Sequence, residues 1–236
     1  MNARWVTIRR RVFALGATAC LFFFLASALA MVAYPGGTLL NPALSGYSFL
    51  QNFFSDLGRT HDFHQRPQPL SWALFTAGLT FLGLVMVAVF SLYPMLFARR
   101  SLARVFSQIG SLGGVLAGAA YLGIAWTPWD LYGPLHLVFV YLAFVSSLLV
   151  VALFIPAIFL EPDYPNRYAW LFTGLALGLS IYLLILFLGP QPKDDAALVL
   201  QATAQKIVVY GEILCMGIQC LGAYRLSATG DQEKMG

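Results

Sequence analysis

Apolar runs about as long as a membrane is thick recur along this chain and limit what it can fold into. A helix needs about 20 apolar residues to cross ~30 Å of hydrocarbon. The 236 residues are 59% hydrophobic and only 10% charged. These runs predict an all-α fold, a polytopic membrane bundle that forms a single domain over residues 1–236. The six transmembrane helices are expected at about 12–34, 71–98, 105–126, 134–160, 168–188 and 195–226.

The basic residues predict the orientation of this bundle, because Lys and Arg are enriched in cytoplasmic loops. Ten of the 14 fall in segments that a six-helix topology places inside: Arg4, Arg9, Arg10, Arg11, Arg99, Arg100, Arg104, Arg167, Arg225 and Lys234. The other four are Arg59, Arg66, Lys193 and Lys206. We therefore predict a multi-pass protein of the cell inner (plasma) membrane with both termini in the cytoplasm. The first apolar run is too long for a typical signal peptide, so we expect it to span.

Glycines at four-residue spacing in two of these helices predict close packing against a neighbouring backbone. They are Gly110, Gly114 and Gly118 in one helix and Gly174 and Gly178 in another. The net charge of +4 does not indicate nucleic-acid binding, because the basic residues lie beside apolar runs. Three cysteines inside apolar runs imply neither a disulfide framework nor a metal site.

The longest loop, residues 35–70, carries a polar-faced stretch from Tyr47 to Gly58. It predicts a short amphipathic helix outside the membrane, with Ser48 and Gln51 as a capping box and Gly58 as a left-handed stop. One stripe is apolar and consists of Phe49, Leu50, Phe53, Phe54 and Leu57. The opposite stripe holds Asn52, Ser55, Asp56 and Arg59. We expect this helix to lie over the outer end of the bundle.

The predicted topology brings polar residues from separate segments to the same outer face. The ligand-binding candidates there are Asn52, Ser55, Asp56, Asp130, His136, Gln205 and Lys206. Glu212 is a further candidate, because Gln205, Glu212 and Gln219 recur every seven residues and share one helix face. This spacing places Glu212 about 10 Å deeper than Gln205. An ionisable residue at that depth should face the bundle interior with a partner.

Several short motifs resemble a known family. Ser55-Asp56-Leu57-Gly58 follows Tyr47-Ser48, His136 follows Pro128 and Asp130, and Gln205-Lys206 opens the last helix. In these features the chain resembles the six-helix bacterial and archaeal membrane family catalogued as domain of unknown function 998. That family is distantly similar to the eukaryotic DRAM and GPI-lipid-remodelling membrane proteins. The resemblance implies a fold and a topology rather than a reaction, and Lys206 stands where the family pattern predicts Arg.

Each ionisable candidate has a functional and a structural interpretation. Asp56 is either a carboxylate in an outer pocket or a structural partner of Arg59, Lys206 or backbone amides. His136 is either a general base oriented by Asp130 or a neutral imidazole bonded between helices, and the helix dipole disfavours its charged form. Glu212 is either a proton-relay or cation site or a protonated carboxyl bonded to a neighbouring helix. The structural interpretation is favoured in each case.

Cofactor and metal signals are weak. His61 and His64 have a His-x-x-His spacing, which makes them weak candidates for a zinc site, but they lie in a proline-bounded loop where solvated histidines are the default. Paired histidines at haem-ligand spacing, a phosphate loop and a dinucleotide fingerprint are not found in the sequence. We therefore predict no metal and no cofactor.

The function predicted from these features is non-catalytic binding of a membrane lipid or a partner subunit through an outer-face polar pocket. Homo-oligomerisation is one form that such a partnership takes. The alternative is a membrane-embedded hydrolase or transferase that acts on an outer-leaflet lipid through Asp56, Asp130 and His136. A third interpretation, proton-coupled transport of a small solute, rests on Glu212 alone and lacks the interrupted helix pair typical of transport sites.

Overall fold

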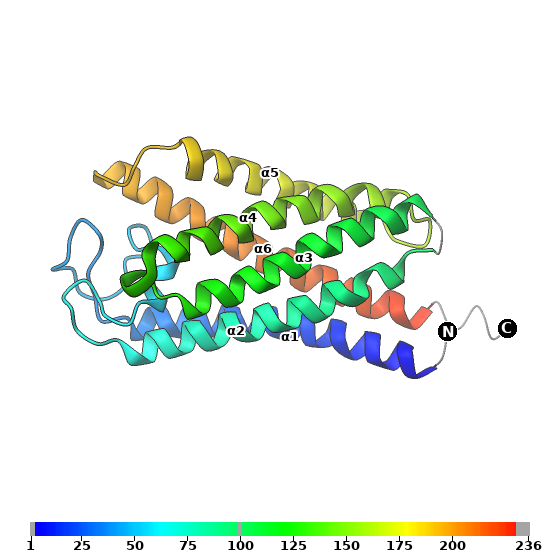
Figure 1. The fold of residues 1–236 in the computed structure, drawn as a ribbon, viewed down its shortest axis with the longest axis horizontal. Coiled ribbons are helices and arrows are strands. Elements are labelled where there is room, and N and C mark those ends of the chain that lie inside the picture. Colours follow the sequence, from blue (N-terminus) through cyan, green and yellow to red (C-terminus); the bar gives the residue numbers. More distant parts are fainter. Residues whose placement is uncertain (1–2, 99–100, 230–236) are drawn as a thin grey trace.

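The computed structural model describes residues 3–98 and 101–229, which form six long α-helices (Figure 1). They are α1 (Ala3–Ala33), α2 (Pro69–Leu92), α3 (Leu102–Trp126), α4 (Trp129–Phe159), α5 (Arg167–Leu188) and α6 (Asp195–Thr229). Two short 3-10 helices, η1 (Phe54–Gly58) and η2 (Tyr93–Leu96), complete the regular structure of these residues. All six α-helices are long and apolar enough to cross a membrane, so the predicted all-α six-helix architecture is confirmed.

The helices form a ring in chain order. Each packs against the next, and α6 packs against α1 to close it. The start of α1 and the end of α6 lie at one end of the bundle, and the long loop of residues 34–68 lies at the other (Figure 1). A ring leaves an interior that is lined by every helix, and aromatic side chains such as Phe23, Phe154 and Phe172 fill much of it.

The helix ends differ from the predicted ones where polar residues continue a helix. α1 begins at Ala3 rather than near residue 12, because no residue between them breaks the helix. Arg9 donates to the Met95 carbonyl at 3.2 Å, and Arg10 donates to the Tyr224 hydroxyl at 2.9 Å. Three residues used to predict the orientation, Arg99, Arg100 and Lys234, lie outside the described residues.

A kink marks the start of α4. Tyr132 has non-helical backbone angles, φ −132° and ψ 34°, so one turn from Trp129 precedes the regular helix. The regular part therefore starts close to Pro134, where the sequence predicted it. A proline is tolerated in a first turn because its missing N–H would have no helical partner there.

The two glycine series have different surroundings. A Cβ at Gly114 would lie 2.1 Å from the Phe90 ring, and one at Gly118 would lie 2.9 Å from the Gly83 carbonyl. Close packing is therefore confirmed on α3. A Cβ at Gly174 or Gly178 would meet nothing within 4 Å, so the same prediction is wrong for α5 within this chain.

Candidate functional site

The stretch from Tyr47 to Gly58 does not form the predicted amphipathic α-helix. The Asn52 amide oxygen accepts from the Ser48 backbone N–H at 2.9 Å and holds a turn, after which only Phe54–Gly58 is helical, as the 3-10 helix η1. Asn side chains compete with helical hydrogen bonds in this way. Gly58 is outside the left-handed region. It is needed for a different reason, because a Cβ there would lie 2.7 Å from the Phe75 ring on α2.

Asn52 and Asp56 form a buried pair at the centre of this loop. The Asn52 amide nitrogen donates to the Asp56 carboxylate at 3.0 Å and to the Gly37 carbonyl at 2.8 Å. The same carboxylate oxygen of Asp56 accepts from the Phe53 N–H at 2.9 Å. Burial raises the pKa of Asp56 to about 6, against these hydrogen bonds and the positive charge of Arg59, which lower it. Of the structural interpretations of Asp56, the bond to a backbone amide is the one found.

Gln205 and Lys206 attach this loop to α6. The Phe54 N–H donates to Oε1 of Gln205 at 2.7 Å. The fully buried Lys206 ammonium donates to the Asn52 carbonyl, and also to the Ala202 carbonyl at 2.7 Å. Both side chains therefore bond backbone groups at the end of the bundle that carries the loop of residues 34–68.

Asp130 holds a second part of the loop. Its carboxylate accepts from the Thr60 N–H at 3.0 Å, the Thr60 hydroxyl at 2.6 Å and the His61 N–H at 3.1 Å. His136 instead bonds the Thr127 carbonyl through Nδ1 at 2.7 Å. The alternative in which Asp130 orients His136 is therefore wrong, whereas the favoured interpretation, an imidazole bonded between two helices, agrees with this bond to the C-cap residue of α3.

The region around His61 and His64 is organised by Asp62. This carboxylate accepts from the backbone of His64 and Arg66 and from the Arg66 guanidinium, each at 2.8 or 2.9 Å. Burial raises the pKa of Asp62, but the hydrogen bonds and charge of Arg66 outweigh burial and hold this pKa below its ordinary value. Among the described residues, no group of three or more potential ligand side chains is placed to hold a metal ion.

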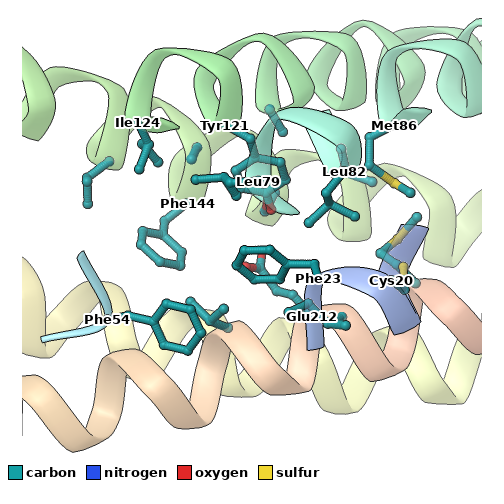
Figure 2. Close-up of a pocket in the computed structure, with 18 of the residues that line it drawn as sticks. Cys20, Phe23, Phe54, Leu79, Leu82, Met86, Tyr121, Ile124, Phe144 and Glu212 are labelled. Carbon is teal, nitrogen blue, oxygen red and sulfur yellow. The ribbon is translucent and has the colours of Figure 1, made fainter. Parts of the chain in front are cut away.

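Beneath the loop, side chains from all six helices and η1 line a cavity of about 90 Å³ inside the ring of helices. Figure 2 shows Phe23, Leu82 and Phe144 around this space. The walls are mostly apolar. The polar lining residues are Ser55, Tyr121, His136, Ser147, Gln205 and Glu212. Phe54 and Ser55 belong to η1, so the loop forms one end of the cavity.

Glu212 faces the interior, as its depth predicted. It lines the cavity, and the hydroxyls of Tyr121 on α3 and Ser147 on α4 interact with its carboxyl group. Figure 2 shows Glu212 and Tyr121 extending toward the same space from different helices. Tyr121 and Ser147 are site residues that the sequence did not indicate. Their only signal was that they are hydroxyl residues within apolar runs.

His136 lines the same cavity nearer the loop and is 2% exposed. Among the described residues its Nε2 has no hydrogen-bond partner. The eight candidates thus divide into three groups. Asn52, Asp56 and Lys206 hold the loop, and Asp130 holds its later part. Ser55, His136, Gln205 and Glu212 line the cavity, and Gln205 also bonds the loop.

No family model, curated protein or solved structure matches this chain.

Proposed function

We propose that this protein binds a membrane lipid without transforming it, and that the apolar part of the lipid occupies the central cavity. The observation that carries the proposal is a mostly apolar cavity lined by all six helices of a bundle whose helices are long enough to span a membrane. We place it in the plasma membrane with both termini cytoplasmic, as the distribution of Lys and Arg predicts. The loop of residues 34–68 then covers the outer end.

The shape of the cavity favours an extended chain. His136, Val140, Ala143, Ser147 and Val151 line it at spacings that repeat one face of α4. The 15-residue separation of the first and last corresponds to about 22 Å along the helix. A space this long with a volume of about 90 Å³ is narrow. It suits a hydrocarbon chain that runs parallel to the helices.

The apolar lining disfavours a polar occupant. A water molecule takes about 30 Å³ and needs two to four polar partners, which most of these walls do not offer. The mostly apolar lining from all six helices also disfavours a small polar solute. Proton-coupled transport therefore has less support than lipid binding, even though Glu212 faces the cavity. The carboxyl group of Glu212 already interacts with Tyr121 and Ser147.

Catalysis at the outer face has less support than binding. Asp56 bonds Asn52 and Phe53, Asp130 bonds Thr60 and His61, and His136 bonds Thr127. A hydrolytic site needs an acid or base within about 3 Å of a nucleophile or its water. These three side chains instead have separate sets of structural partners.

Native mass spectrometry tests the proposal on protein extracted in a mild detergent. The wild-type chain should retain one lipid, and Ala143→Leu should lose it, because the added side chain fills a cavity-lining position. Val140→Phe is a second filling variant in case the first fails to fold. Val138→Leu on the exposed face of α4 is the matched control and should retain the lipid. A lipid-free wild-type protein, or equal retention in the filled variants, would overturn the proposal.

A further inference from the structure

A nitrogen atom of the cavity wall has no hydrogen-bond partner among the described residues. The His136 side chain is only 2% exposed, and its Nε2 atom makes no hydrogen bond within the described residues. A buried polar atom left unpaired costs about 1–3 kcal/mol. Trp129 contacts the ring edge-on, with centroids 5.9 Å apart, and offers the nitrogen no bond. An occupant of the cavity is the remaining source of a partner.

The bond at the other ring nitrogen fixes what Nε2 offers. A carbonyl oxygen only accepts, so the 2.7 Å contact with Thr127 requires Nδ1 to carry a proton. The neutral ring then presents a lone pair at Nε2. The charged ring is disfavoured by the apolar cavity and by the first turns of α4, where the helix dipole is positive. Nε2 is therefore a hydrogen-bond acceptor.

The cavity lining also limits the charge of the occupant. Among the described residues that line it there is no Lys or Arg, and the one acidic side chain, Glu212, supplies no positive charge in either of its protonation states. A phosphate or carboxylate group in the cavity would lose its hydration without gaining a cation, which is costly. The polar group that enters must be neutral and must donate a hydrogen bond.

We propose that the ligand is a neutral lipid alcohol whose hydroxyl donates to Nε2 of His136 while its chain extends along α4 toward Glu212. This assignment rests on the proposed lipid binding and adds the chemical class of the lipid. His136 lies about two turns from Trp129, an aromatic residue of the kind that occupies membrane interfaces. That depth suits a hydroxyl at the upper end of an otherwise apolar molecule.

Two matched probes test the assignment. 1-Decanol donates a hydrogen bond, and decyl methyl ether has the same chain without a donor. We would measure the rise in melting temperature of the full-length protein in phosphatidylcholine nanodiscs as a function of the mole fraction of each probe. The wild type should bind the alcohol about tenfold more tightly than the ether, which is the effect of one buried hydrogen bond.

Two variants locate this preference at Nε2. His136→Asn retains a donor near the position of Nδ1 but removes the acceptor, so its alcohol preference should fall to about onefold. His136→Gln places an amide oxygen near the position of Nε2 and should retain a preference. If His136→Asn prevents folding, the comparison of alcohol with ether in the wild type still tests whether the ligand is an alcohol.

The outcomes separate this assignment from the proposed function. Equal binding of alcohol and ether by the wild type would overturn the lipid alcohol and leave lipid binding in the cavity standing. An undiminished alcohol preference in His136→Asn would overturn the role of Nε2. If neither probe binds and both filled variants, Ala143→Leu and Val140→Phe, retain lipid as the wild type does, the proposed lipid binding in the cavity is itself overturned.

Discussion

The backbone N–H of Phe54 donates to Oε1 of Gln205 at 2.7 Å across 151 positions of the chain. This bond joins η1 to α6 at the upper end of the cavity. Both residues also line that cavity. The polar groups at the loop end of the bundle are thus used to close it, and the cavity lies beneath them.

Gln205→Leu should therefore destabilise the protein by about 1–3 kcal/mol, because it leaves the buried Phe54 N–H without an acceptor. The measurement is chemical unfolding in detergent micelles. Thr203→Val is a matched control, since the half-buried Thr203 also bonds the loop, but through a solvent-exposed hydrogen bond to the Leu50 carbonyl at 3.2 Å. An equal effect of the two substitutions would contradict the role given to Gln205.

The stability of the loop should depend on pH through Asp56. Its folded-state pKa is about 6, above the ordinary 3.8, so the folded protein holds this proton more tightly than the unfolded chain. The resulting stabilisation is complete below about pH 4 and is lost as pH rises through about 6. Relative to Asp56→Asn, the wild type should lose about 2 kcal/mol between pH 4 and 7. A constant difference between the two proteins over this range would contradict the account.

Asp130 should control access to the segment that follows η1. Asp130→Ala removes the acceptor for the Thr60 and His61 N–H groups and for the Thr60 hydroxyl. Trypsin cleavage after Arg59 should become at least severalfold faster, because local opening exposes this site. Asp163→Ala in the exposed α4–α5 loop is the control and should leave the rate unchanged. An unchanged rate in Asp130→Ala would be inconsistent with this anchoring.

The two glycine series should respond differently to the same substitution. Gly114→Ala should cost more than about 2 kcal/mol, because the new methyl group overlaps the Phe90 ring. Gly178→Ala should be neutral or stabilising by up to about 1 kcal/mol, since alanine favours a helix and meets open space. Thermal unfolding of both variants measures the difference. Comparable losses would show that α5 is packed against a partner at Gly178.

The sequence was sufficient to predict the six helices, because hydrophobic length is a property of a local segment. It also predicted that Glu212 faces inward, from its seven-residue spacing with Gln205. It did not predict which glycines pack, since Gly114 and Gly178 have the same spacing pattern and differ only in the neighbouring helix.

The loop and the cavity depended on contacts between distant segments. The turn at Asn52 forms because its side chain finds Ser48, Gly37 and Asp56, of which only Ser48 and Asp56 are close in sequence. Similarly, the partners of Glu212 come from α3 and α4. Hydrogen-bond choices of this kind are decided by tertiary structure rather than by local pattern.

The central claim is that a lipid occupies the cavity between His136 and Glu212, and a crystal structure of protein kept in its native lipid throughout purification tests it most directly. The account predicts continuous elongated density along α4, with one end within 3.2 Å of Nε2 of His136. A well-ordered cavity that holds no elongated density, or only separate peaks at water positions, would contradict it.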